Sequence, residues 1–283
     1  MTVSSLSFYE CGYCTHSKKI IYSKGSYQQM KFPATVALIK HDKIGYILFD
    51  TGYASHFFEA TKSFPYSAYA KITPVYFSEE KSIKRQLEKD GIDRSQIKYI
   101  ILSHFHGDHT AGLKDFPEAK ILSFNKAYQN ISTKSKFHAI TKGCLHDLLP
   151  DDLEARISFI DKMIELQLDK SYGEFTIGFD IFNDNSLIAT DLTGHAIGQF
   201  GIFVNLKSGK RVFLVADAVW ISDTYEKLVY PHWLANIIIE DKKSYRRNVE
   251  RLNDLHTRYP EIDIVPTHCY RTGEKVKRGI IYE

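Results

Sequence analysis

Apolar positions along the first half of the chain fall into short runs whose period separates strands from helices. Val36–Ile39 and Ile44–Phe49 flank three polar residues and predict a hairpin, and Ile97–Leu102 predicts a short buried strand. Glu79–Asp90 predicts a helix, because a serine that can cap it precedes the segment, acidic residues begin it and a glycine follows it.

The second half of the chain repeats this alternation. Asp151–Leu168 has apolar residues at helical spacing, and Lys242–Tyr259 shows the clearest helical pattern, ended by Pro260. Strands are predicted at Ser186–Ala189, Phe200–Leu206, Arg211–Val215 and Ile262–Val265. Two groups of strands with helices between and after them predict an α/β sandwich.

The chain has no internal repeat and no linker-like segment, so residues 1–283 are predicted to form a single domain. Residues 130–178 carry no candidate metal ligand and include Phe137, Leu145, Leu148 and Leu149. We expect this segment to be an insertion that forms an apolar wall or lid of a substrate pocket. A packed insertion with no contact to substrate is the alternative.

Composition excludes several classes of protein. The formal net charge is +3, which gives no strong field for nucleic acid, and clusters such as Lys134 and Lys136 are interpreted as solvated faces. No apolar run is long enough to span a membrane, and the N-terminus shows no signal peptide. Four cysteines in a chain of 283 residues do not form a disulfide framework. We therefore expect a cytoplasmic protein with no nucleic-acid or membrane partner.

Candidate metal ligands gather in one motif, Ser-His-Phe-His-Gly-Asp-His at 103–109. It places three imidazoles and a carboxylate, the ligand types of catalytic zinc sites, directly after a predicted strand. A histidine-rich surface loop that binds metal adventitiously is the alternative for this motif alone. Three further candidates, His195, Asp217 and His268, also follow predicted strands, where loops can hold a site open to substrate.

Together with Asp50-Thr51-Gly52, these motifs resemble the metallo-β-lactamase superfamily in order and spacing. The resemblance implies an αββα sandwich with two metal ions at one edge. It implies that one metal is held by His104, His106 and His195, that the second is held by Asp108, His109 and His268, and that Asp217 bridges them. Asp50 is expected to support the site through hydrogen bonds without binding metal. Two zinc ions are expected, with iron, manganese or cobalt as alternatives.

Such a centre implies a metal-dependent hydrolase in which a metal-bridging hydroxide attacks an ester or lactone carbonyl. Asp108 is expected to orient the hydroxide or move its proton. Within the superfamily, the layout is similar to the quorum-quenching N-acyl homoserine lactonases, which implies a small substrate with an apolar acyl part. Where that family has a tyrosine beside the substrate carbonyl, this chain has Trp220, the second candidate catalytic residue. A homodimer is also considered.

The same motifs also leave several alternatives open. A phosphodiesterase, a thioesterase similar to glyoxalase II and an iron-dependent sulfur dioxygenase share this fold, and so do non-catalytic effectors. Cys11 and Cys14 have zinc-knuckle spacing, with His16 nearby, but no second such pair exists in the chain. Their role is left open.

Overall fold

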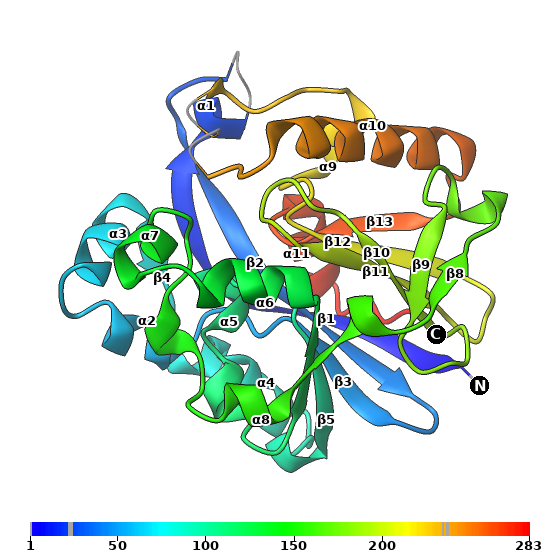
Figure 1. The fold of residues 1–283 in the computed structure, drawn as a ribbon, viewed down its shortest axis with the longest axis horizontal. Helices are drawn as coiled ribbons and strands as arrows, with labels where there is room; N and C mark the ends of the chain where they lie inside the picture. The colour runs from blue at the N-terminus through cyan, green and yellow to red at the C-terminus, as the bar shows by residue number, and fades with distance from the viewer. Residues whose placement is uncertain (1, 22–24, 234, 236–237) are drawn as a thin grey trace.

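Two β-sheets pack face to face and helices lie outside them (Figure 1). The computed structural model describes residues 2–21, 25–233, 235 and 238–283. The predicted αββα sandwich is confirmed, and among the described residues no helix is long and apolar enough to cross a membrane.

The first sheet has seven strands in the order β4-β1-β2-β3-β5-β6-β7. Strands β3, β5, β6 and β7 are parallel, so their carboxyl ends lie at one edge, whereas β1, β2 and β4 pair antiparallel. The strands are β1 (Val3–Ser17), β2 (Gln29–His41), β3 (Gly45–Phe49), β4 (Val75–Tyr76), β5 (Ile97–Ile101), β6 (Lys120–Ser123) and β7 (Ile157–Phe159).

The second sheet has six strands in the order β13-β12-β11-β10-β9-β8. Strands β8 to β12 pair antiparallel in succession and β13 joins β12 in parallel, so β10, β12 and β13 run in the same direction. The strands are β8 (Glu165–Gln167), β9 (Ile177–Asp180), β10 (Leu187–Asp191), β11 (Phe200–Asn205), β12 (Arg211–Ala216) and β13 (Asp263–Pro266).

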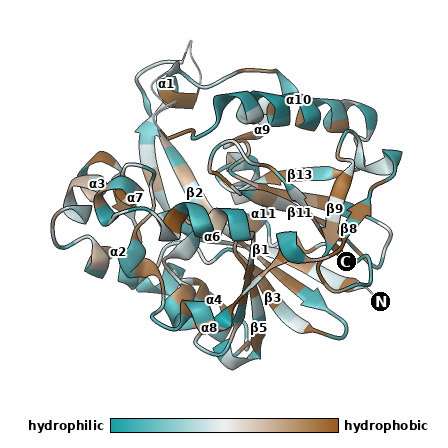
Figure 2. Ribbon diagram, in the orientation of Figure 1, coloured by the Kyte–Doolittle hydropathy of each residue, from teal (hydrophilic) through white to brown (hydrophobic). Residues whose placement is uncertain are grey.

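Helix α10 (Lys242–Arg258) covers the outer face of the second sheet. Its buried residues recur every three or four positions, and its polar face is coloured hydrophilic in Figure 2. The other α-helices are α1 (Lys18–Ile21), α2 (Ser55–Ala60), α3 (Tyr66–Ile72), α4 (Ile83–Lys89), α5 (Gly107–Thr110), α6 (Asn125–Ser132), α7 (Lys136–Ile140), α8 (Leu153–Arg156), α9 (Ser222–Glu226) and α11 (Tyr270–Lys277). Short 3₁₀ turns are η1 (Glu79–Lys81), η2 (Arg94–Gln96), η3 (Leu113–Asp115), η4 (His146–Leu148), η5 (Ile160–Lys162) and η6 (Lys170–Tyr172).

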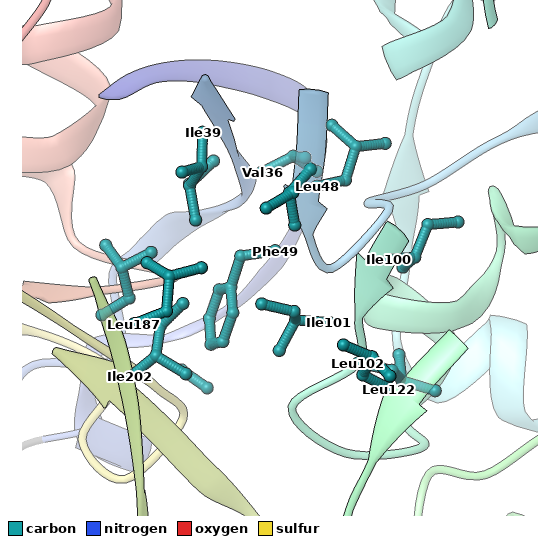
Figure 3. Close-up of a cluster of buried hydrophobic side chains, with 14 of the residues drawn as sticks. Val36, Ile39, Leu48, Phe49, Ile100, Ile101, Leu102, Leu122, Leu187 and Ile202 are labelled. Carbon is teal, nitrogen blue, oxygen red and sulfur yellow. The ribbon is translucent and has the colours of Figure 1, made fainter. Parts of the chain in front are cut away.

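The main core lies between the two sheets. Ile39 and Phe49 from the first sheet face Leu187 and Ile202 from the second (Figure 3). A second cluster fills the space between the second sheet and α10, and a third packs near the metal-ligand motifs around Trp220. Burial on both faces explains why the central strands read as nearly continuous apolar runs.

The predicted strands and the helix at 242–259 are confirmed. The helix predicted at 79–90 is confirmed only in its second part, because Ser82 is extended, caps α4 (Ile83–Lys89) and separates it from the 3₁₀ turn η1. The helix predicted at 151–168 is wrong. Only Leu153–Arg156 is α-helical, and the chain then enters β7. Ile157 pairs with Ile121 of β6, and Ile164, which the helix would have buried, is exposed. Pairing with a sheet edge therefore overrides an apolar spacing that resembles a helix.

Residues 130–178 are integrated into the sandwich more closely than an insertion would be. They supply β7 to the first sheet, and β8 and the start of β9 to the second. The segment before Pro33 is largely strand. Cys11 and Cys14 both lie in β1: Cys11 is within an irregularity between Glu10 and Tyr13 in the pairing with β2, and Cys14 follows it and pairs with Phe32.

Candidate metal centre

The strand ends of both sheets bring the seven predicted ligands together. His104 follows β5, His195 follows β10, Asp217 follows β12 and His268 follows β13. Because these strands end at the same edge of the sandwich, residues up to 164 positions apart become neighbours. Three groups have ligand atoms within 4.8 Å of one another, namely His104, His106 and His195; His104, His109 and Asp217; and Asp108, His109 and His268.

Asp217 lies between the other ligands. Its Oδ2 atom is 3.0 Å from His268 Nε2 and 3.4 Å from His195 Nε2, and its Oδ1 atom is 3.4 Å from His109 Nε2. His195 Nε2 is 3.0 Å from His106 Nδ1. Asp108 Oδ2 is 3.3 Å from His268 Nε2. This geometry gives two histidine-containing groups with one carboxylate between them.

Hydrogen bonds from behind the site fix which ring nitrogen faces inward. His109 Nδ1 is 2.7 Å from Asp50 Oδ2, and His268 Nδ1 is 2.8 Å from the Pro33 carbonyl oxygen. Each ring donates from Nδ1 to its oxygen acceptor and turns Nε2 toward the centre. The expected supporting role of Asp50 is confirmed in this hydrogen bond. Its carboxylate also accepts from the Ser103 backbone N–H and hydroxyl, both at 2.8 Å.

Several buried polar atoms here have no hydrogen-bond partner within the described part of the chain. They include His104 Nε2, His109 Nε2 and Asp217 Oδ1. A buried polar atom without a partner costs about 1–3 kcal/mol. Nitrogen and carboxylate oxygen atoms that converge in this way fit divalent cations, because coordination uses the same lone pairs. The residues present therefore fit a dinuclear metal centre.

The two histidine groups differ in their electrostatics. Burial lowers the pKa of His104 and of His195 well below the usual value. Both rings are therefore neutral and each keeps a lone pair that could bind a metal ion. Burial would also lower the pKa of His109, but Asp50, Asp108 and Asp217 outweigh burial and raise it well above that value. For Asp217, burial would raise the pKa, and the charges of His268 and His109 hold it well below its usual range.

Trp220 and an apolar cluster lie beside the centre. The Trp220 ring stands edge-on to His195 with centroids 5.7 Å apart, and the side chain is buried. Leu145 and Leu148, from the segment expected to form an apolar wall, share this cluster, whereas Phe137 is exposed. None of the metal-ligand groups found among the described residues includes Cys11, Cys14 or His16.

Sequence reasoning missed other residues that support the site, among them Pro33, Gly143 and Glu240. Gly143 has a φ of 76°, and a Cβ atom there would lie 3.2 Å from the His106 ring. These residues lie outside the metal-ligand motifs, and their spacing gave no signal for them.

Comparison with known proteins agrees with this geometry. Residues 31–123 match the profile of the metallo-beta-lactamase superfamily. The N-acyl homoserine lactonase AttM of Azorhizobium caulinodans is 24% identical over 239 residues, which cover 83% of this chain and 82% of the relative. The lactonase AiiB of Agrobacterium fabrum is 23% identical over 63% of this chain and 60% of its own length.

Solved structures show the same fold at low identity. A mutant of B. thuringiensis AiiA with N-decanoyl-L-homoserine bound has a TM-score of 0.74 at 18% identity, covering 97% of both chains. The dizinc quorum-quenching lactonase AidC has a TM-score of 0.61 at 14% identity, covering 95% of this chain and 89% of that one. The matched region and the shared fold thus make this chain similar to the metal-dependent hydrolases of the metallo-β-lactamase superfamily. In layout it is similar to the N-acyl homoserine lactonases.

Proposed function

We propose that this chain is a dinuclear-metal lactonase that opens the ring of N-acyl homoserine lactones, and thereby a quorum-quenching enzyme. The observation that carries the proposal is the convergence of seven metal-ligand side chains at one edge of a fold shared with lactonases. Residues His104, His106 and His195 would hold one ion, Asp108, His109 and His268 the second, and Asp217 would bridge them.

Zinc is the proposed metal, because imidazole with carboxylate is its usual ligand set and a structural relative is a dizinc enzyme. Two such ions would supply Lewis acidity at the carbonyl and acidify water at neutral pH. Metal analysis of the purified protein tests this assignment, with iron, manganese and cobalt as alternatives.

The protein's own groups would orient substrate and move protons. Asp108 is part-exposed, and its Oδ2 atom lies 3.3 Å from His268 at the candidate metal centre. Its carboxylate would take the proton of the attacking water and pass it to the leaving alkoxide. Trp220 offers an indole N–H donor beside His195, where the lactonase family has a tyrosine hydroxyl. The apolar cluster around Leu145 would contact the acyl chain.

The test is to incubate metal-loaded protein with acyl homoserine lactones that have short and long acyl chains. Hydrolysis is measured by the release of acid. His268→Ala serves as the control variant. We expect ring opening that is lost in the variant. A lactone panel that stays intact while a chromogenic phosphodiester or a glutathione thioester is cleaved would assign the chain to another hydrolase class. Oxygen uptake on a persulfide with one iron per chain would indicate a sulfur dioxygenase.

A cytoplasmic location is also proposed. The four cysteines are free thiols, all of them buried. Unpaired thiols are typical of proteins in a reducing compartment.

A further inference from the structure

Glu240 connects the His195 loop with the segment that precedes α10. Its backbone N–H donates to the His195 carbonyl oxygen at 3.1 Å, and the next N–H, of Asp241, donates to the Gly194 carbonyl at 2.9 Å. The chain just before α10 therefore pairs with the backbone of a metal-ligand residue. The side chain of Glu240 extends this contact.

The Glu240 carboxylate is the centre of a buried polar network. Its Oε2 atom accepts from the Ile197 backbone N–H at 2.8 Å and from Asn130 Nδ2 at 2.9 Å, and Lys134 Nζ lies 3.6 Å from Oε1. Lys134 also donates to the Asn130 carbonyl oxygen at 2.8 Å. The side chains of Glu240 and Lys134 are 7% and 13% exposed. A buried carboxylate is tolerated because it is paired and hydrogen-bonded.

This network corrects the interpretation of Lys134 as part of a solvated basic face. Lys136, two residues along the chain, fits that interpretation, because its side chain is 57% exposed and it pairs with an exposed Asp147. The two lysines thus provide a matched pair in one short segment. One is in a buried network that reaches a metal-ligand loop, and the other is on the surface.

The network supports one metal group and not the other. His195 lies 3.0 Å from His106, whose neighbour Gly107 donates its backbone N–H to the Gly143 carbonyl at 3.1 Å. Asn130, Lys134, Gly143 and Glu240 therefore lie behind the loops that carry His106 and His195. By contrast, His109 and His268 are held by Asp50 and Pro33, on the side of the first sheet.

We propose that Glu240 is a positioning residue for the metal site of His104, His106 and His195. It acts by fixing the 194–197 loop, with Asn130 and Lys134 holding its carboxylate in place. The inference rests on the proposed function in one respect, namely that these histidines bind metal. It requires no particular substrate.

Glu240→Gln is the variant that tests the proposal. The amide oxygen can still accept from Ile197, but the charge opposite Lys134 is gone and an amide N–H₂ faces the ammonium group. The probe is Zn²⁺ alone, titrated in competition with a chromogenic chelator. We expect two binding steps in the wild type and a roughly 10-fold weaker affinity in one step of the variant, as is usual when a supporting residue behind a ligand is changed.

Reference variants assign the two steps. His195→Ala should remove the step that Glu240→Gln weakens, and His268→Ala should remove the other. Lys134→Met should weaken the same step as Glu240→Gln, whereas Lys136→Met should leave both steps unchanged. In the double variant Lys134→Met/Glu240→Gln, the loss should be smaller than the product of the two single losses, because neither group is then left unpaired.

Two results would overturn the proposal. One is a Glu240→Gln titration that matches the wild type, and the other is equal weakening of both steps, which would indicate general loss of structure. If Glu240→Gln does not fold, Lys134→Met against Lys136→Met decides the question alone. Because the titration contains no substrate, a failure of the lactonase assignment leaves this test intact.

Discussion

Asp50 is a single residue behind the site that orients one of its imidazole rings. It stands at the end of β3 with a φ of 63°, a left-handed conformation that aspartate and asparagine adopt more readily than most residues. Its carboxylate receives the imidazole N–H of His109 and two donors from Ser103. The position of this carboxylate therefore orients the His109 ring, and its negative charge strengthens the hydrogen bonds from His109 and Ser103.

Asp50→Asn keeps the backbone preference and the size of the side chain but removes the charge. The His109 ring loses its carboxylate partner, so we expect Zn²⁺ affinity at the site of Asp108, His109 and His268 to fall about 10- to 100-fold. Metal content after dialysis against a chelator measures the loss. Asp42→Asn, at an exposed aspartate bonded to Thr2, is the control. Full retention of two metals by Asp50→Asn would contradict the prediction.

Trp220 is tested by comparison with the other tryptophan. If its indole N–H donates to the substrate, Trp220→Phe loses one hydrogen bond, worth about 1 kcal/mol, and kcat falls roughly fivefold with little change in KM. Trp233 is 67% exposed, and Trp233→Phe should leave both constants unchanged. Steady-state kinetics on an acyl homoserine lactone gives the answer. An unchanged kcat in Trp220→Phe would show that the indole N–H makes no such contact.

Among the elements, the turn between α7 and η4 bears directly on His106. Gly143→Ala would strain a residue with φ of 76° and push a Cβ atom to 3.2 Å from the His106 ring. Gly209→Ala shares the strain, with φ of 85°, but its Cβ would meet no atom within 4 Å. We expect each variant to lose about 1 kcal/mol of unfolding free energy. Only Gly143→Ala should also lose Zn²⁺ affinity. An equal loss of Zn²⁺ affinity in both variants would contradict a specific effect of the Gly143 turn on the His106 ring.

Local patterns predicted those elements whose local and tertiary preferences agree. The hairpin of β2 and β3, strand β5 and helix α10 were predicted because burial and period coincide there. The segment after Leu153 was misread, because its isoleucines are spaced like a helix while sheet pairing decides their conformation. Such pairing depends on β6, 36 residues earlier, which no local window contains.

The same distinction applies to the site. Its candidate ligands were predicted from the sequence, because their motifs follow predicted strands and their side chains are of the types that bind metal. Their supports were not, since a support is defined by its partner. The Pro33 carbonyl that orients His268 lies 235 positions away, and Glu240 reaches Asn130 across 110 positions. A backbone carbonyl or a lone glutamate has no motif that reveals such a contact.

For the whole molecule, we expect metal binding and stability to be linked through the protons of two histidines, His109 and His268. In the metal-free protein, the pKa values of His109 and His268 are raised, because nearby aspartates outweigh burial. Such groups contribute stability that is fully present below about pH 6.5, their unfolded pKa, and is lost as pH rises through the folded value. The pKa of Asp217 is lowered, so its contribution is constant above about pH 4.

The histidines with lowered pKa values, His104, His106 and His195, add little pH dependence above about pH 7.5, because they are then almost fully neutral in both folded and unfolded chains. In that range, metal-free stability should therefore fall with rising pH. The metal-loaded protein needs all these rings neutral and loses nothing by deprotonation. We thus expect the Tm difference between zinc-loaded and metal-free protein to widen steadily from about pH 7.5 upward. Thermal unfolding of both forms across this range measures it, and Asp50→Asn should flatten the trend by removing a charge that raises the pKa of His109. A Tm difference that stays constant with pH would mean that these two rings are already neutral before metal binds.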